Sequence, residues 1–389
     1  MTKPVILTLV NYYLPGYKAG GTIRSLANLV QQLGDEFFFK IVTNDRDHQD
    51  RAPYPDVRVN GWNEVGKASV YYVSTKMRTL AGIRRILLES GCDVLYLNSL
   101  LSPWFSILPL VLRRLRLIPP RPVVLAPRGE FAPGAMALKT RRKKAFWHAA
   151  RAAGLFRDLT WQAGSPDEAR DMRAWLGPAQ PIMVARDPSG AIPSKVRPQG
   201  HGRQGPLRVV FLARISAIKN LEGALAILRG IRGQLLFDIY GPIEDDAIWN
   251  RCRAAIAALP VNVTARYRGV LTPGQVPEVL AGYDVFFLPS GSESFGHVIL
   301  EALAAGLPVV ISDRTPWRDL AAAGVGFDLP LERPELFGAA FEKILAASAE
   351  ELDAWSARAH AFALKRLTDP EAGDQHRELF TRALAKAGP

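Results

Sequence analysis

The sequence predicts an α/β protein built from two doubly wound, Rossmann-like domains that face each other across a cleft. Short apolar, β-branched runs alternate with amphipathic helical patterns, which is typical of parallel sheets covered by helices. The alternation stops in a proline- and glycine-rich segment between residues 187 and 206 and then begins again. A chain of 389 residues also exceeds what one hydrophobic core usually supports.

The apolar runs and the helical spacing define the elements of the first domain, predicted over residues 1–190. Strands are expected at 5–10, 37–43, 70–74, 94–97 and 123–126, and helices at 22–33 and 80–89. The last two strands lack polar alternation, as expected for strands that are buried on both faces of a parallel sheet.

After a linker predicted over residues 191–206, the second domain is predicted over 207–365, followed by a C-terminal segment over 366–389. Strands are expected at 207–212, 234–240, 263–267, 285–288 and 308–312, and helices at 221–228, 249–258, 276–280, from residue 295 to 306, 334–347, 350–365 and 374–387. Ligands of such sheets bind beyond the carboxyl ends of the strands, so the cleft is the expected site.

The composition excludes several classes of protein. Two cysteines far apart in sequence argue against a disulfide framework and fit a reducing cytoplasm. The longest apolar region, 100–112, is interrupted by prolines and is shorter than the roughly 20 residues of a membrane-spanning helix. The apolar stretch at 5–10 is too short for a signal sequence. We therefore expect a cytoplasmic protein.

Part of the net charge of +12 lies in a basic run over residues 139–144, which Phe146 and Trp147 follow. The run contains Lys139, Arg141, Arg142, Lys143 and Lys144. One interpretation is a solvated helix face. Another is a helix on an anionic membrane surface, which would place the protein peripherally on the inner face of the cell membrane. Nucleic acid is the least favoured partner, because no nucleic-acid-binding motif accompanies the charge.

The strongest chemical signal is the segment 286–313, where a buried strand leads through a Ser/Gly-rich turn into a helix. We expect Ser294 to cap that helix. The free N–H groups at its start then form an anion site suited to a diphosphate. The residues expected at this site are Phe295, Gly296, His297 and Val298. Gly296 lets the ligand come close, and His297 acts through its backbone more than its ring.

Glu293 precedes this helix and Glu301 lies about two turns inside it, so the two carboxylates span on the order of 10 Å. A retaining glycosidase pair needs about 5 Å. The longer span suits a nucleotide sugar, with Glu293 accepting from sugar hydroxyls and Glu301 from the ribose diol. The alternative is that Glu293 is a capping acid and Glu301 a buried carboxylate paired with an arginine.

This segment resembles the paired-glutamate motif of retaining glycosyltransferases of family 4 (glycosyl transferases group 1), which have the GT-B fold. The resemblance covers the second domain and, more weakly, the first. It implies that Glu293 contacts the donor sugar and Glu301 the ribose. It also implies a hexosyltransferase-type reaction with retention at the anomeric carbon, and a last helix that packs back on the N-terminal, acceptor-side domain.

Two further segments of the second domain resemble the family's donor site. In the segment 211–220, Arg214 and Lys219 resemble the clamp that neutralises the leaving diphosphate. The alternative is a basic pair on the surface. In the segment 267–272, Val270 resembles the residue whose backbone meets the nucleotide base.

The first domain carries weaker signals. Gly20 and Gly21 resemble the family's glycine loop, which approaches the donor phosphates or the acceptor; the alternative is a simple turn. Arg128 follows a buried strand where the family often has a histidine, and we expect either Arg128 or Glu130 to act on the acceptor side. The Asp-x-Asp of residues 45–47 is interpreted as loop charge, and neither a metal site nor another cofactor is expected.

The predicted function is transfer of a sugar from a nucleotide diphosphate sugar to a glycan or lipid-linked acceptor, in surface polysaccharide or glycolipid assembly. Two alternatives stay open. One is a nucleotide-sugar epimerase, which would act on the donor alone. The other is a non-catalytic protein that binds a nucleotide sugar or a glycan.

Overall fold

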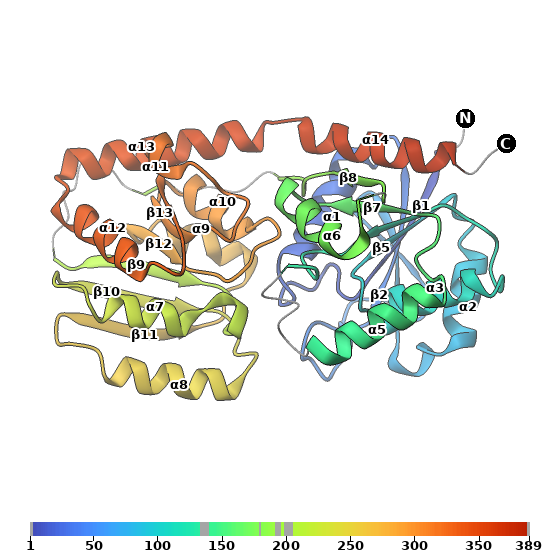
Figure 1. The fold of residues 1–389 in the computed structure, drawn as a ribbon, viewed down its shortest axis with the longest axis horizontal. Helices are drawn as coiled ribbons and strands as arrows, with labels where there is room; N and C mark the ends of the chain where they lie inside the picture. Colours follow the sequence, from blue (N-terminus) through green and yellow to red (C-terminus); the bar gives the residue numbers. More distant parts are fainter. Residues whose placement is uncertain (1–2, 133–139, 179, 191–195, 198–204, 387–389) are drawn as a thin grey trace. The chain divides into compact units, whose positions relative to one another are not determined.

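The chain forms two compact units in the computed structural model (Figure 1). The structure describes residues 3–132, 140–178, 180–190, 196–197 and 205–386. Unit 1 combines Met1–Gly190 with Pro370–Pro389, and unit 2 is Ala191–Asp369. The predicted linker over 191–206 lies mostly outside the described residues.

Unit 1 is built on an eight-stranded sheet with the order β3-β4-β2-β1-β5-β6-β7-β8. Its strands are β1 (Val5–Val10), β2 (Phe38–Asn44), β3 (Trp62–Val65), β4 (Ala68–Val73), β5 (Val94–Asn98), β6 (Val123–Ala126), β7 (Leu159–Ala163) and β8 (Ile182–Val184). Neighbouring strands are parallel, except that β3 pairs with β4 in an antiparallel hairpin.

Helices cover both faces of this sheet. One face packs against α1 (Gly21–Leu33) and α14 (Glu371–Ala385). The other packs against α2 (Leu80–Glu89), α3 (Leu108–Arg114), α5 (Thr140–Ala152) and α6 (Pro166–Leu176). Two shorter helical segments, η1 (Thr75–Met77) and η2 (Pro103–Ile107), follow β4 and β5. Helix α14 contacts α1 and β5, and Arg377 forms an ion pair with Glu36 at 2.6 Å.

Unit 2 is built on a six-stranded parallel sheet with the order β11-β10-β9-β12-β13-β14. Its strands are β9 (Leu207–Leu212), β10 (Leu235–Tyr240), β11 (Val263–Gly269), β12 (Val285–Leu288), β13 (Val309–Ser312) and β14 (Gly326–Leu329). Numbered within the unit, the order is 3-2-1-4-5-6, which is that of the Rossmann fold.

The helices of unit 2 surround one continuous hydrophobic core. They are η3 (Ala217–Lys219), α7 (Leu221–Leu228), α8 (Asp246–Ala257), η4 (Pro273–Gln275), α9 (Val276–Leu280), α10 (His297–Ala304), α11 (Leu320–Ala323), α12 (Pro334–Ala346) and α13 (Ala349–Leu367). A capping box starts α13, because Ser348 Oγ accepts from the Glu351 N–H and the Glu351 carboxylate accepts from the Ser348 N–H.

The expectation of two doubly wound α/β sheets is confirmed, and the ten predicted strands and nine predicted helices lie within a few residues of their predicted bounds. The sequence analysis missed β3, β7, β8 and β14. Strand β3 is a partly exposed edge strand, and β7 has the sequence Leu-Thr-Trp-Gln-Ala, whose polar residues are nevertheless fully buried. Neither pattern gives the unbroken apolar run that marks a buried parallel strand.

The basic run of residues 139–144 falls on the start of α5. Lys139 and the side chains of residues 140–143 lie outside the described residues, so the membrane-facing interpretation of this run stays a prediction. No helix in the described part of the chain combines the length and the apolar character needed to cross a bilayer.

Candidate active site

The strand order of unit 2 marks the position of a ligand site. Strands β9 and β12 are neighbours, and the chain leaves them toward opposite edges of the sheet. In open α/β sheets the loops after two such strands separate and leave a crevice at their carboxyl ends. The loop after β9 carries Arg214 and Lys219, and the loop after β12 carries Glu293. Three predicted site residues therefore lie at the switch point.

An ion pair joins these two loops. Lys219 Nζ lies 2.6 Å from Glu293 Oε1, and the side chains are only 14% and 9% exposed. The backbones of the two loops are joined as well, because the Gly291 N–H donates to the carbonyl oxygen of Ile218 at 2.6 Å. Both charged groups are therefore held at fixed positions beside the ends of β9 and β12.

Arg214 lies on the same edge of the sheet. It forms an ion pair with Glu244, from the loop that follows β10. Gly241 has φ +140, and a Cβ atom there would lie 1.9 Å from the carbonyl oxygen of Ala213. Only glycine therefore allows the β10 loop to pass so close to the backbone that carries Arg214.

The helix at the switch point begins later than predicted. Helix α10 starts at His297, and its N-cap is Gly296 in the left-handed conformation, with φ +79. The expectation that Ser294 caps this helix is therefore wrong. The positive φ of Gly296 interrupts the helical path, and Trp317 Nε1 donates to the carbonyl oxygen of Phe295 at 2.6 Å, which fixes the turn. The intrahelical hydrogen bonds of α10 begin at Ile299, whose N–H donates to the carbonyl oxygen of Gly296 at 2.9 Å.

The remaining predicted donor residues lie on α10 and after β11. Val298 is half-buried in the first turn of α10, and Glu301 is half-buried one turn further on. At the far end of the helix, His360 Nδ1 lies 2.6 Å from the carbonyl oxygen of Ala304, which anchors α10 against α13. Val270 is 44% exposed and follows Gly269, which has φ +88, at the carboxyl end of β11.

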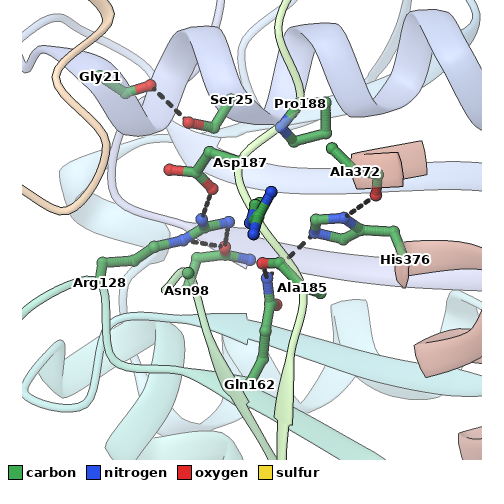
Figure 2. A network of polar contacts seen from close by, with 12 residues as sticks. Gly21, Ser25, Asn98, Arg128, Gln162, Ala185, Asp187, Pro188, Ala372 and His376 are labelled. Carbon is green, nitrogen blue, oxygen red and sulfur yellow. Dashed lines mark hydrogen bonds and ion pairs between the residues drawn. The ribbon is translucent and has the colours of Figure 1, made fainter. Parts of the chain in front are cut away.

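In unit 1 the corresponding switch point lies between β1 and β5. Val10 is paired with Asn98, so the two strands end side by side. Gly20 is the N-cap of α1, with φ +90, and Gly21 is the first helical residue. Ser25 Oγ donates to the carbonyl oxygen of Gly21 at 3.0 Å (Figure 2). The glycine pair therefore forms the turn from the β1 loop into a helix.

Asp47 fixes this glycine loop, and its interpretation as loop charge is wrong. Its carboxylate accepts from the backbone N–H groups of Tyr17 at 2.7 Å and Lys18 at 3.0 Å. Both Asp45 and Asp47 are buried, at 2% and 3% exposure. Asp45 forms an ion pair with Arg46. The spacing of the two aspartates gave no signal for this role, because the partners of Asp47 lie 30 and 29 residues away in sequence.

Arg128 lies in a buried polar network at the carboxyl end of β6 (Figure 2). It has φ +56. Its guanidinium donates to Asn98 from Nε at 3.0 Å and from Nη2 at 2.6 Å, to Tyr96 Oη at 2.9 Å, and forms an ion pair with Asp187. Burial has the largest single effect and lowers the pKa of Arg128, but Asp187, Tyr96 and Glu168 together raise it above its ordinary value.

Two glutamates hold the loop that carries Arg128. Glu168 accepts from the N–H groups of Gly129 at 2.6 Å and Gly164 at 2.7 Å, while burial raises the pKa of its carboxyl group. Glu130 accepts from Ser99 Oγ at 2.8 Å and from the Leu101 N–H at 3.1 Å. Glu130 therefore braces the loop after β5, a role that the sequence did not reveal.

A chain of hydrogen bonds connects Arg128 to helix α14. Tyr96 Oη, which accepts from Arg128, donates to Gln162 Oε1 at 2.6 Å. Gln162 Nε2 lies 3.0 Å from both the Ala185 carbonyl oxygen and His376 Nε2. His376 Nδ1 lies 2.9 Å from the carbonyl oxygen of Ala372. These partners define the neutral tautomer with the proton on Nδ1, and burial lowers the pKa of His376 to about 4.

Neither Asp187 nor His376 was a predicted site residue. Asp187 stood at the start of the proline-rich segment and His376 on the last helix, so nothing local linked them to Arg128. Figure 2 shows Asp187 next to the guanidinium of Arg128, and His376 between Gln162 and Ala372. In the described part of the chain, no group of three or more His, Cys, Asp or Glu residues could hold a metal ion.

Residues 195–362 match the family described as glycosyl transferases group 1. The match covers less than half of the chain. The match lies within unit 2 and includes the ion pair of Lys219 and Glu293, as well as Arg214 and Glu301. The resemblance noted in the sequence is thereby confirmed for the part of the chain that carries its motifs.

Curated relatives within this family match only part of the chain. The sulfoquinovosyl transferase of Arabidopsis thaliana is 31% identical over 103 residues, which are 26% of this chain and 18% of that protein. The phosphatidyl-myo-inositol mannosyltransferase of Mycobacterium tuberculosis is 37% identical over 151 residues, 38% of this chain and 39% of that protein. The matched segments thus span less than two fifths of these relatives.

Solved structures of glycosyltransferases match nearly the whole chain. The sucrose-phosphate synthase of Thermosynechococcus elongatus superposes with a TM-score of 0.73 at 17% identity, covering 99% of this chain and 100% of that one. The Anabaena protein HepE, solved with UDP and glucose, gives a TM-score of 0.69 at 15% identity and covers 97% and 100%. At these identities the likeness shows the fold, which is GT-B.

Proposed function

We propose that this chain is a retaining glycosyltransferase that moves a hexose from a nucleotide diphosphate sugar to a hydroxyl group of a glycan or lipid-linked acceptor. The observation that carries the proposal is the ion pair of Lys219 and Glu293, which joins the loops after β9 and β12 at the switch point of a Rossmann sheet. The match of residues 195–362 to the family described as glycosyl transferases group 1 supports it.

Each donor group has a counterpart at this edge of unit 2. Lys219 and Arg214 supply positive charge for the diphosphate, and the first N–H groups of α10, at His297 and Val298, supply hydrogen-bond donors. Glu293 accepts from the sugar hydroxyls and Glu301 from the ribose diol. An incoming diphosphate competes with Glu293 for Lys219, so donor binding frees the Glu293 carboxylate to accept from the sugar.

The proposed chemistry needs no protein nucleophile. The bond between the anomeric carbon and the diphosphate oxygen breaks, and a bond from the acceptor oxygen to the same face of that carbon forms. The acceptor's proton passes to the departing diphosphate. Lys219 and Arg214 stabilise the negative charge that builds on that group in the transition state.

The proposal for the acceptor is based on what two relatives are named for and on residues of unit 1. Two relatives are named for transfer involving sulfoquinovose and phosphatidyl-myo-inositol, which favours a lipid-linked acceptor for this chain. Gly20, Gly21 and Arg128 remain the proposed acceptor-side residues. Arg128 already uses four N–H groups on protein partners, so we propose that it acts by holding the loops around it.

The test begins with the donor. The change in melting temperature of the full chain with uridine-, guanosine- and adenosine-diphosphate sugars identifies the base of the donor. Uridine is the first choice, because HepE was solved with UDP. We expect Lys219→Met to weaken nucleotide binding at least about tenfold, because removal of a charge-assisted contact costs about 1.5–3 kcal/mol. The matched control Lys343→Met removes a cation on α12, far along the sequence from the site.

Product analysis then separates the alternatives. With the identified donor and a membrane-lipid extract as acceptor, the proposal predicts a glycosylated product with the donor's anomeric configuration, and no such product with Glu293→Gln. An epimerised sugar with donor alone would support an epimerase. Donor binding with neither product would support a binding protein. Wild-type transfer by Glu293→Gln would overturn the assignment of that residue.

A further inference from the structure

One surface of unit 1 combines exposed leucines with arginines. This surface, here called the α2–α3 surface, consists of α2, α3 and the connecting residues 115–121. Leu115 is 61% exposed, Leu88 42% and Leu117 38%. Exposed leucines scattered singly are common in proteins, but a group of them within one small area indicates an interaction site.

Helix α3 and the segment after it pack on α2, which brings the segments that carry these leucines together. Helices α2 and α3 are in contact. Arg84 Nε, on α2, donates to the carbonyl oxygen of Leu117 at 2.8 Å. A pocket next to this contact is lined by Leu88 of α2 and by Ile118 and Pro119 of the connecting segment. The apolar side chains of the two segments therefore form one patch.

The charge of the same surface is strongly positive. Residues 80–122 contain six arginines, and the acids among them are Glu89 and Asp93. Asp93 is engaged in a structural role, because its carboxylate accepts from the Val5 N–H at 2.8 Å. Arg113 and Arg114 donate to the carbonyl oxygens of Arg157 and Ala153, so these hydrogen bonds orient the guanidinium groups without neutralising them.

We propose that the α2–α3 surface docks unit 1 on an anionic lipid bilayer. Residues 113–117 read Arg-Arg-Leu-Arg-Leu, which places exposed leucines between arginines at the end of α3. At a bilayer, the guanidinium groups meet headgroup phosphates while the leucines enter the boundary with the acyl chains. An acidic protein partner would satisfy the arginines but not the exposed leucines, so lipid is favoured.

This inference deepens the proposed function, because a lipid-linked acceptor would be reached at a membrane surface. It concerns a different part of the chain from the basic run of residues 139–144. Binding to vesicles needs no turnover, so it can be measured whether or not the proposed reaction is correct.

The experiment is flotation of the full chain with vesicles of phosphatidylcholine, with and without phosphatidylglycerol. We expect binding only to vesicles that contain phosphatidylglycerol, and release when sodium chloride is added. Each basic residue near an anionic surface strengthens binding about fivefold. The variant Arg85→Glu with Arg121→Glu should therefore bind at least about 25-fold more weakly.

Two further variants complete the test. Leu115→Ser with Leu117→Ser should weaken binding about tenfold or more while its remaining binding stays salt-sensitive. The control Arg229→Glu with Arg232→Glu makes the same charge change on exposed residues of unit 2, outside the proposed surface, and should bind within about twofold of wild type.

The proposal is overturned if the wild type binds equally well to vesicles with and without phosphatidylglycerol. It is also overturned if the Arg229/Arg232 control loses as much binding as the Arg85/Arg121 variant. The nucleotide-induced thermal shift of every variant reports folding. If the Arg85→Glu variant fails to fold, Arg85→Gln with Arg121→Gln gives the milder test, with at least about a fivefold loss expected. Vesicle binding without any nucleotide response in the wild type would contradict the proposed function and leave this inference standing.

Discussion

Both units place a cationic side chain beyond the carboxyl ends of parallel strands, but the two cations differ in how many of their hydrogen-bond donors the protein uses. At the switch point of unit 2, the ammonium group of Lys219 has three N–H donors and one ion-pair partner among the described residues. In unit 1, the guanidinium of Arg128 uses four of its five N–H donors on Asn98, Tyr96 and Asp187. Lys219 therefore keeps N–H donors that a ligand can use, whereas most N–H donors of Arg128 are already used on protein partners.

This difference shows that burial alone does not identify a binding residue. The side chains of Arg128 and Lys219 are similarly buried, at 11% and 14% exposure. What separates them is the number of hydrogen bonds already made. A saturated buried network is rigid and specifies one arrangement of its loops, while an unsaturated ion pair can exchange one partner for a ligand phosphate.

The largest expected effect tests the saturated network. Arg128→Met leaves the Asp187 carboxylate buried without its cation, so we expect the free energy of unfolding to fall by about 3–5 kcal/mol. Urea denaturation of the full chain, followed by circular dichroism, measures it. The control Arg251→Met breaks the exposed ion pair with Glu222 and should change the free energy of unfolding far less, because solvent screens exposed ion pairs. Equal losses in the two variants would contradict the comparison.

A second prediction uses the pH dependence of the same network. His376 is neutral in the folded chain with a pKa of about 4, below its value of about 6.5 in the unfolded chain. The neutral His376 ring therefore makes its full contribution to the free energy of unfolding above pH 6.5, and this contribution is lost as the pH falls toward about 4. The loss amounts to about 3 kcal/mol. In His376→Asn the free energy of unfolding should fall less steeply than in the wild type between pH 6.5 and about 4. If the pH profiles of variant and wild type ran parallel, the neutral state assigned to the buried His376 would be refuted.

The smallest expected effect tests the helix start in unit 2. Gly296→Ala places a Cβ atom at a φ of +79 and 2.8 Å from Ile299 Cδ1, which should cost about 1–2 kcal/mol of unfolding free energy. The nucleotide-induced thermal shift should also decrease, because the first turn of α10 moves. Gly274→Ala, with open space around its Cβ position, should change stability by less than about 1 kcal/mol. A Gly296→Ala variant that matched this control would disprove the strain.

The parts of the fold that local pattern encodes could be predicted from sequence. Strands such as β9 and β12 are unbroken apolar runs, and the parallel topology then brings the loops after them together. That reasoning was enough to place Lys219 and Glu293 at one switch point. It was not enough to predict that they pair with each other, because the conformations of the two loops depend on backbone contacts such as that of Gly291 with Ile218.

The rest of the fold and of the candidate site depends on contacts between residues that are far apart in sequence. Gln162 and His376 are separated by 214 residues, and neither has a local pattern that marks it as buried. Asp47 resembles any acidic loop residue until its carboxylate meets the backbone of the glycine loop. The N-cap of α10 was misplaced because Ser294 and Gly296 are both favourable capping residues, and the choice depended on the Trp317 contact with Phe295.

The position of α14 in unit 1 has a consequence for synthesis of the chain. Phe380 packs its ring against Phe37, Phe39 and Tyr96, in the core between α1 and the sheet. A ribosome adding about 5–20 residues per second makes this helix only after all of unit 2. The nascent first unit therefore waits roughly 10–40 s with these aromatic rings uncovered. During that interval unit 2 can already fold, so the first unit to be translated is the last to be completed.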